Sequence, residues 1–134
     1  TKELIEAEIS KFDLDKDVIW LPRLAYDELP LLYSGASALI FPSLFEGCGI
    51  PVIEAMACGC PVAASDLKVV KEFADEAVFF FNGKSVDNIC SAMVKLQSDP
   101  LFREKLINKG INRSRFFTGE HVVEKLLSAY KGVS

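Results

Sequence analysis

The chain has 134 residues, half of them apolar, and a formal net charge of −4 at pH 7. This length and composition give one domain with enough apolar side chains for a core and exclude a disordered segment. Because the charge gives no broad attraction to nucleic acid and the apolar runs are far below the roughly 18 residues that span a bilayer, we expect a soluble cytoplasmic protein without a nucleic-acid partner.

Strands and helices alternate along the chain. Apolar periodicity and turn residues predict, in order, a helix at 2–12, a strand at 18–21, a helix at 27–35, a strand at 38–41, a helix at 51–58, a strand at 62–64, a helix at 69–74, a strand at 78–81, and helices at 86–97, 100–115 and 119–130. This order predicts the α/β class, a Rossmann-like parallel sheet with flanking helices. Ligands of such sheets bind beyond the carboxyl ends of the strands, where residues 43–49 and 65–66 fall.

The helix at 51–58 carries one carboxylate. Every other residue from Pro51 to Cys58 is apolar, so we expect a buried helix with Glu54 shielded from water. A buried carboxylate needs partners, because losing hydration without them is costly. No Lys or Arg lies between Arg23 and Lys68. The partners must therefore come from distant chain, from backbone N–H groups, or from a ligand with paired hydroxyls.

A glycine loop precedes this helix. Gly47 and Gly49 bracket Cys48 and permit backbone angles and close approach that a Cβ would block. Pro51 suits the first helical position, where no N–H is needed. Free N–H groups and the positive end of the helix dipole at this start suit a phosphate group. The glycine spacing matches neither the dinucleotide fingerprint nor the P-loop.

Glu46, the Gly-x-Gly turn, Pro51, Glu54 and the following AMACGCPVAAS resemble the Glu-x7-Glu signature of retaining, nucleotide-sugar-dependent glycosyltransferases of family 4, or group 1, which have the GT-B fold. The resemblance implies that Glu54 binds the ribose hydroxyls and that Glu46 contacts the hydroxyls of the sugar being transferred. It implies that backbone amides of the glycine loop hold sugar hydroxyls, and that those at the helix start face the diphosphate. The implied donor-binding residues are Glu46, Gly47, Cys48, Gly49, Ile50, Val52 and Glu54, with Glu46 also the catalytic residue. No metal and no cofactor beyond the nucleoside diphosphate sugar are implied.

Enzymes of the family that this sequence resembles also contain regions that residues 1–134 do not match. Family members place an Arg and a Lys on the diphosphate from an upstream segment, and they bind the acceptor in an N-terminal lobe. We therefore interpret residues 1–134 as a single partial nucleotide-sugar-binding domain, part of the C-terminal lobe of a GT-B enzyme, inactive alone. The expected partners are the sugar donor and the N-terminal lobe of a hexosyltransferase-type parent in polysaccharide or glycoconjugate biosynthesis. In the family's sheet, two strands that residues 1–134 do not match lie between the strand at 18–21 and the strand at 38–41. We therefore expect the strands at 18–21 and 38–41 not to pair with each other in a regular sheet.

Other chemically active residues receive simpler interpretations. The four cysteines lack zinc-type spacing, so we expect buried free thiols. His121 is expected on a helix surface. We expect a solvated basic face formed by Lys109, Arg113 and Arg115. The alternative is that this face contacts an anionic membrane surface in the parent enzyme. At 65–72 the sequence departs from the family pattern, with Lys68 and Lys71 where a small residue and a Pro are usual. The last helix of the family crosses back to the other lobe, so we expect part of 122–130 to be exposed.

The function expected from these residues is transfer of a sugar from a nucleoside diphosphate sugar to a hydroxyl acceptor, with retention. Catalysis would be electrostatic, because negative charge builds on the leaving diphosphate. An acid and nucleophile pair of Glu46 and Glu54, as in glycoside hydrolases, is not expected. Two alternatives remain: a nucleotide-sugar epimerase or phosphorylase of the same fold, and a non-catalytic nucleotide-binding or assembly module.

Overall fold

A three-stranded parallel sheet forms the centre of the molecule in the computed structural model, which describes residues 2–132. Its order is β1 (Leu39–Phe41), β2 (Val62–Ser65) and β3 (Phe79–Phe81). Leu39 lies opposite Val62, and Ala63 lies opposite Phe79. The helices are α1 (Lys2–Lys11), α2 (Leu29–Gly35), α3 (Ile50–Ala57), α4 (Lys68–Ala74), α5 (Val86–Ser98), α6 (Pro100–Ser114) and α7 (Gly119–Lys131), with 3-10 turns η1 (Asp75–Ala77) and η2 (Arg115–Phe117). The predicted α/β class is confirmed.

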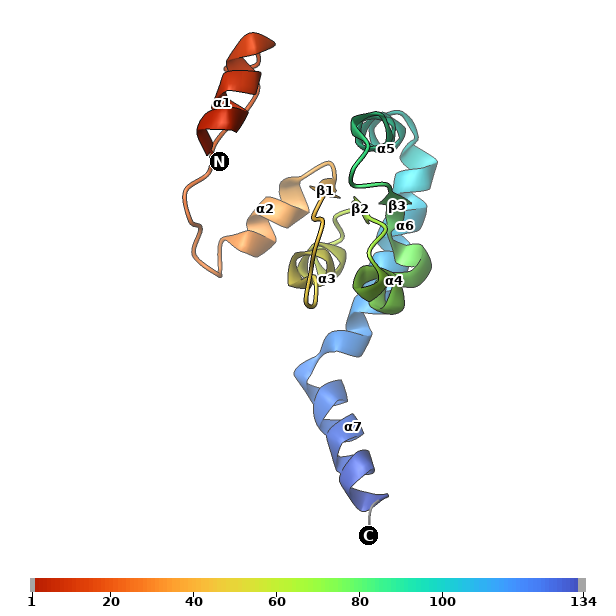
Figure 1. Ribbon diagram of the computed structural model, residues 1–134. Coiled ribbons are helices and arrows are strands. Elements are labelled where there is room, and N and C mark those ends of the chain that lie inside the picture. Colours follow the sequence, from red (N-terminus) through yellow and green to blue (C-terminus); the bar gives the residue numbers. More distant parts are fainter. Residues whose placement is uncertain (1, 133–134) are drawn as a thin grey trace.

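Helices cover both faces of the sheet, because successive side chains of each strand point to opposite faces. Figure 1 shows the strands between α3 and α4 on one side and α5 on the other. Val62 and Ala64 belong to one core cluster, together with Val52, Met56 and Val70 of α3 and α4. Ala63 belongs to a second cluster, with Ala92, Leu96 and Leu106 of α5 and α6. Both faces of β2 are therefore buried, which explains its unbroken apolar run.

Two glycines with left-handed backbone angles delimit α3. Gly49 precedes the helix with φ 76°, and Gly59 follows it with φ 71°. At the end of the helix, the Gly59 N–H donates to the Met56 carbonyl at 3.1 Å and the Cys60 N–H donates to the Ala55 carbonyl at 2.9 Å. These bonds satisfy the last carbonyls of the helix and stop it. The chain then turns directly into β2.

Short polar side chains begin the last three helices. Ser85 accepts from the Asn88 N–H at 3.3 Å, Asp99 accepts from the Phe102 N–H at 2.9 Å, and Thr118 accepts from the His121 N–H at 3.3 Å. These are ordinary N-caps, which fix where a helix starts. The observed bounds of the predicted helices agree with the sequence prediction to within two residues at nearly every end.

The predicted strand at 18–21 is wrong. These residues form no strand, and the side chains of Ile19 and Trp20 are 78% and 47% exposed. A strand forms where a neighbour accepts and donates its backbone hydrogen bonds, and apolar alternation alone supplies no neighbour. Within the described residues, β1 pairs only with β2. Because residues 18–21 form no strand, the expected gap between two unpaired strands is not tested.

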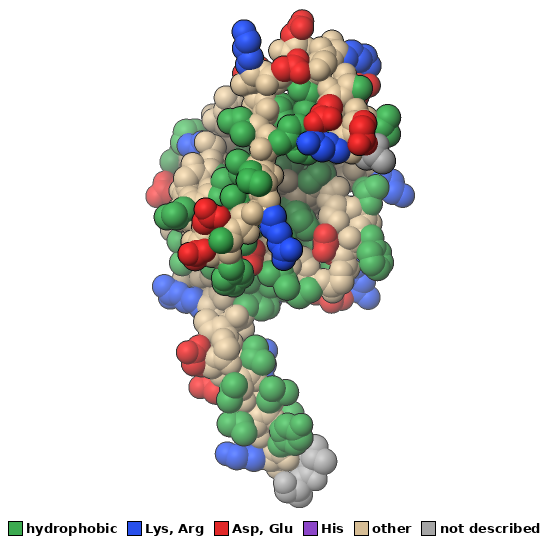
Figure 2. All heavy atoms as spheres, turned by 90° about the vertical axis from the view of Figure 1, so that its left-hand side faces the viewer, with side chains coloured by type: hydrophobic (Ala, Val, Ile, Leu, Met, Phe, Trp, Pro, Cys, Tyr) green, Lys and Arg blue, Asp and Glu red, His purple; other side chains and the backbone are tan. Residues whose placement is uncertain are grey.

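Helix α7 extends away from the sheet (Figure 1). Apolar side chains gather along its face in Figure 2, and they are about half exposed or more: Val122, Val123, Leu126, Leu127 and Tyr130. The expected exposure of this face is confirmed. No helix among the described residues combines the length and apolar character needed to cross a membrane.

Candidate functional site

Three loops meet at the carboxyl ends of the three strands. A Cβ built on Gly83, which follows β3, would lie 2.1 Å from the Ser65 hydroxyl at the end of β2 and 3.4 Å from Cδ2 of Leu44, which follows β1. The structure therefore brings residues 43–49 and 65–66 to one edge of the sheet, where the topology predicts a ligand.

Gly49 is the residue that requires glycine in the loop before α3. It is buried, and besides its positive φ a Cβ there would lie 3.3 Å from Cζ of Phe73 and 3.5 Å from Cγ2 of Val70. Gly47 differs, because nothing lies within 4 Å of its Cβ position. Packing of the chain therefore explains Gly49, while Gly47 keeps the outer side of the loop open.

The loop and the start of α3 present free backbone N–H groups. Within the described part of the chain, the N–H groups of residues 47–50 donate to no other protein group. The Val52 N–H donates to the Gly49 carbonyl at 3.0 Å, and the Val52 side chain is fully buried. Free N–H groups at a helix N-terminus favour an anion.

Glu46 lies half-buried beside one cavity of about 330 Å³. Loop residues Leu44 and Phe45 form one wall, and the start of α4 forms the other, with Leu67, Lys68, Val69 and Glu72. The ammonium group of Lys68 lies 3.8 Å from the Glu72 carboxylate, and that of Lys71 lies 3.4 Å from the Asp66 carboxylate. Of the two lysines that depart from the family pattern, Lys68 therefore lines this cavity, and each of the two is paired with a carboxylate.

Glu54 lies beside a second, more enclosed cavity of about 190 Å³. Its walls come from α2 and the segment before it (Tyr26, Leu29, Pro30, Tyr33) and from α3 (Ala57, Cys58). The Tyr33 hydroxyl donates to Glu54 Oε2 at 3.3 Å. Burial, with the nearby Glu54 charge, raises the pKa of Tyr33 to about 12. The prediction of a fully shielded Glu54 is wrong, because the residue is half-buried and one side of α3 faces this cavity.

Tyr33 was not identified from the sequence. The sequence predicted donors from distant chain, from backbone N–H groups or from a ligand, and the Tyr33 hydroxyl, 21 positions away, is a donor of the first kind. A tyrosine in the last turn of the helix before β1 could have signalled it. The structure also places Glu46 and Glu54 in different cavities, Glu46 opposite the start of α4 and Glu54 between α2 and the end of α3. The two carboxylates are therefore suited to different parts of one ligand.

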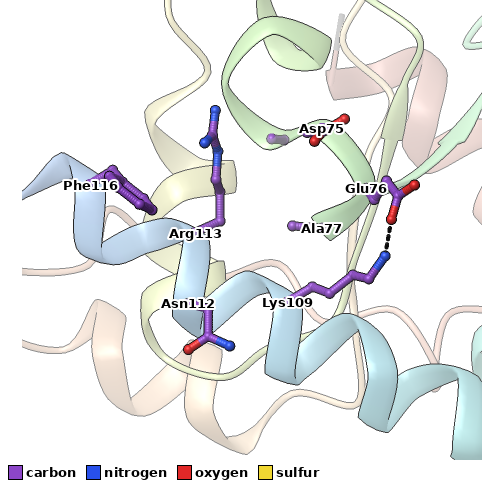
Figure 3. Close-up of a pocket in the computed structure, with 8 residues that line it drawn as sticks. Asp75, Glu76, Ala77, Lys109, Asn112, Arg113 and Phe116 are labelled. Carbon is purple, nitrogen blue, oxygen red and sulfur yellow. Dashed lines mark hydrogen bonds and ion pairs between the residues drawn. The ribbon is translucent and has the colours of Figure 1, made fainter.

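Several other predictions are corrected by the structure. Among the cysteines, all free, only Cys60 is buried; Cys58 is half-buried, and Cys48 and Cys90 are exposed because they lie on the loop and on the outer face of α5. Burial raises the pKa of Cys60. The solvated face is wrong for Lys109 and Arg113, because α6 turns both toward η1 and the end of α4 (Figure 3).

The family model described as "Glycosyl transferases group 1" matches residues 1–113. The chain belongs to the group 1 glycosyl transferases. It is 31% identical over 115 residues to the O-antigen chain mannosyltransferase B of Escherichia coli, a match that covers 84% of this chain and 30% of that protein. It is 38% identical over 88 residues to the O-antigen chain mannosyltransferase RfbU of Salmonella typhimurium, covering 66% of this chain and 25% of the relative. The chain thus spans less than a third of these group 1 relatives.

Solved structures of glycosyltransferases share the fold of this group 1 chain. Sucrose-phosphate synthase of Thermosynechococcus elongatus superposes with a TM-score of 0.86 at 25% identity, over 96% of this chain and 33% of the synthase. The C-terminal domain of the group 1 family protein LpcC from Francisella tularensis superposes with a TM-score of 0.74 at 30% identity, over 84% of this chain and 59% of that domain. The predicted membership of the GT-B, group 1 glycosyltransferases is confirmed.

Proposed function

We propose that this chain binds the nucleoside diphosphate sugar of a retaining glycosyltransferase. One observation carries the proposal: the free N–H groups of residues 47–50 lie along the chain between two half-buried carboxylates, Glu46 and Glu54, which line separate cavities. A nucleoside diphosphate sugar has a matching order of groups. Its two sets of hydroxyls, on the sugar and on the ribose, flank a diphosphate.

In this proposal each group of the site has one task. The free N–H groups of the glycine loop bind hydroxyls of the transferred sugar, and the free Ile50 N–H at the start of α3 faces the diphosphate. Glu46 accepts from hydroxyls of the transferred sugar, and Glu54 accepts from the ribose hydroxyls. Among the described residues, Tyr33 donates to Oε2 of Glu54 and no side chain donates to Oε1. Oε1 is therefore available to accept from the ribose. The apolar walls of the Glu54 cavity then lie beside the base.

Catalysis in the proposed enzyme is electrostatic. As the glycosidic bond breaks, negative charge grows on the leaving diphosphate, and the oriented N–H groups at the start of α3 stabilise that charge. Neither carboxylate acts as a nucleophile. The separate cavities of Glu46 and Glu54 support this, because a two-carboxylate hydrolysis needs both groups on one glycosidic bond.

The names of the relatives indicate mannose as the transferred sugar. The two curated relatives described above are named mannosyltransferases of O-antigen chains. We therefore propose a nucleoside diphosphate mannose as the donor and a growing polysaccharide as the acceptor of the complete enzyme. The family membership supports sugar transfer, and the names of the relatives support this choice of sugar.

Calorimetric titration of the 134-residue chain tests the proposed site. The ligands are the diphosphates of guanosine, uridine and adenosine and their mannose conjugates. We expect saturable binding of one base, and Glu54→Gln should weaken it by about 10- to 150-fold, or ~1.5–3 kcal/mol, because it loses charge-assisted hydrogen bonds to a diol. Glu104→Gln, an exposed carboxylate on α6, is the matched control and should bind like wild type. Saturation by none of the ligands, or equal affinity of Glu54→Gln and wild type, would contradict the proposal.

A further inference from the structure

Side chains of α6 hold the carboxyl end of α4. Arg113 Nε donates to the Phe73 carbonyl at 2.5 Å, and its Nη2 donates to the Glu72 carbonyl at 3.5 Å. Both carbonyls lie in the last turn of α4, where helix carbonyls lack partners within the helix. One turn earlier on α6, Lys109 pairs with Glu76 of η1. Figure 3 shows both basic side chains extending from α6 toward this segment, across a cavity of about 300 Å³.

The Arg113 side chain is itself held in place. Its guanidinium lies 5.6 Å from the Phe116 ring centre and 6.0 Å from that of Phe117. Helix α6 is also in close contact with α3, because a Cβ on Gly110 would lie 3.2 Å from Cγ of Met56. Arg113 follows Gly110 by three residues and so lies on the same side of α6. Arg113 therefore fixes α4 to a helix that is packed directly on α3.

The same end of α4 contacts the turn that begins α3. A Cβ on Gly49 would lie 3.3 Å from Cζ of Phe73, a tight contact, and the Phe73 ring packs edge-to-face on Phe117 with 5.8 Å between ring centres. The other end of α4 forms the wall of the cavity beside Glu46. A displacement of α4 would therefore move both the support of the Gly49 turn and the wall opposite Glu46.

We propose that Arg113 is a positioning residue for the diphosphate site: its hydrogen bonds to α4 set the place of Phe73 and so hold the Gly49 turn in the shape that presents free N–H groups. The ligand affected is the diphosphate of a nucleotide sugar, so the inference rests on the proposed function. Arg113 does not touch the ligand. It acts through α4, from the opposite end of that helix to the Glu46 cavity.

Arg113→Met tests this inference, since it keeps the aliphatic length and removes both hydrogen bonds. Two controls account for the loss of a positive charge and for general destabilisation of the fold. Arg115→Met removes the same charge from an exposed neighbour that makes no hydrogen bond to α4, and Leu96→Ala opens the core on the other face of the sheet. We expect Arg113→Met to weaken binding of the nucleoside diphosphate roughly 10-fold. Neither control should change the affinity, although Leu96→Ala lowers the melting temperature.

Backbone amide NMR gives a second readout that general destabilisation does not produce. In Arg113→Met the amide resonances of residues 49–52 should shift or broaden, and in both controls they should stay in place. Phe73→Leu keeps the Arg113 hydrogen bonds, which go to backbone carbonyls, and removes the ring that contacts Gly49. It should move the same resonances, and it replaces Arg113→Met as the test if that variant does not fold.

The outcomes separate the inference from the proposed function. Unmoved resonances of residues 49–52 in Arg113→Met would overturn the positioning role, as would an equal loss of affinity in Leu96→Ala. If the wild-type chain bound no diphosphate, the proposed function would fail, while movement of these resonances would still support Arg113 as the residue that sets the turn.

Discussion

Glu54 combines partial burial with one hydrogen-bond partner for its carboxylate among the described residues, the Tyr33 hydroxyl. A half-buried carboxylate retains some hydration and needs fewer hydrogen bonds than a fully buried one. The sequence predicted donors from distant chain, from backbone N–H groups or from a ligand, because no Lys or Arg lies between Arg23 and Lys68, and Tyr33 is a donor from distant chain. It could not show that the helix would leave one side beside a cavity, since this depends on how α2 packs against α3.

The titration of Tyr33 reports this contact. Burial and the Glu54 charge raise its pKa from 10.0 to about 12, so the folded state keeps the proton that an unfolded tyrosine loses. This contribution to stability is fully present below pH 10 and is lost as the pH rises from about 10 to 12. Glu54→Gln should lower the pKa of Tyr33 without returning it to 10, because burial remains. Tyrosinate absorbance in a Tyr26→Phe, Tyr130→Phe background measures it, and an unchanged titration would show that the Glu54 charge does not act on Tyr33.

Glu46 should act on the sugar rather than on the nucleotide. In the complete enzyme, Glu46→Ala should slow turnover by about 10- to 150-fold, the range expected for a charged hydrogen bond that strengthens as the glycosidic bond opens. Affinity for the sugar-free diphosphate should change little. Steady-state rates and titration of the diphosphate are the two measurements, with Glu104→Ala as the control. Equal losses in both would require the roles of Glu46 and Glu54 to be reassigned.

At the scale of elements, the ends of β2 and β3 pack with little tolerance. Ser65 is 2% exposed, and its hydroxyl has no hydrogen-bond partner among the described residues. Gly83 lies directly against it, with no space for a Cβ. The contact brings the two loops together and buries a polar group without compensation, so the two residues should be energetically coupled.

Gly83→Ala should therefore lower the free energy of unfolding by about 1–3 kcal/mol through overpacking. Ser65→Ala should leave it unchanged or raise it by up to about 1 kcal/mol, because an unpartnered hydroxyl is removed. In the Ser65→Ala background the cost of Gly83→Ala should fall, although the two Cβ atoms would still be close at 3.0 Å. Urea unfolding gives all four values. Gly35→Ala, in open space within α2, is the control and should stabilise by about 0.5–1 kcal/mol. Additive effects of the two substitutions would refute the coupling.

The elements show what the sequence can predict. Strong periodicity and local signals such as Gly59, Ser85 and Asp99 define helices well, since the residues that start and stop a helix lie within it or beside it. The strand at 18–21 could not be judged in this way, because a strand depends on a neighbour elsewhere in the chain. The same limit applies to the contacts of Arg113 with α4, which join residues about 40 positions apart.

At the scale of the molecule, the chain has the layers and ligand edge of one GT-B lobe, and exposed apolar side chains lie on the 18–21 segment, on the α7 face and on the loop at the ligand edge, where Phe45 is 87% exposed. The curated relatives are more than three times longer than the matched region. Sugar transfer requires an acceptor hydroxyl held against the sugar as well as a bound donor. The proposed site accounts for the donor, and in this proposal Glu46 contacts the sugar where an acceptor must approach.

We therefore expect the 134-residue chain to bind the nucleoside diphosphate without transferring sugar. Mass spectrometry after incubation with each mannose conjugate should find neither a mannosylated acceptor nor free mannose above the uncatalysed level, because no acceptor is oriented and the growing charge on the diphosphate is only partly stabilised. Joining the chain to the remaining lobe of a complete group 1 enzyme should restore turnover, and Glu46→Ala should reduce it. Product formed by the chain alone, and lost in Glu46→Ala, would show that this single α/β unit holds both substrates and that the second lobe is not needed for chemistry.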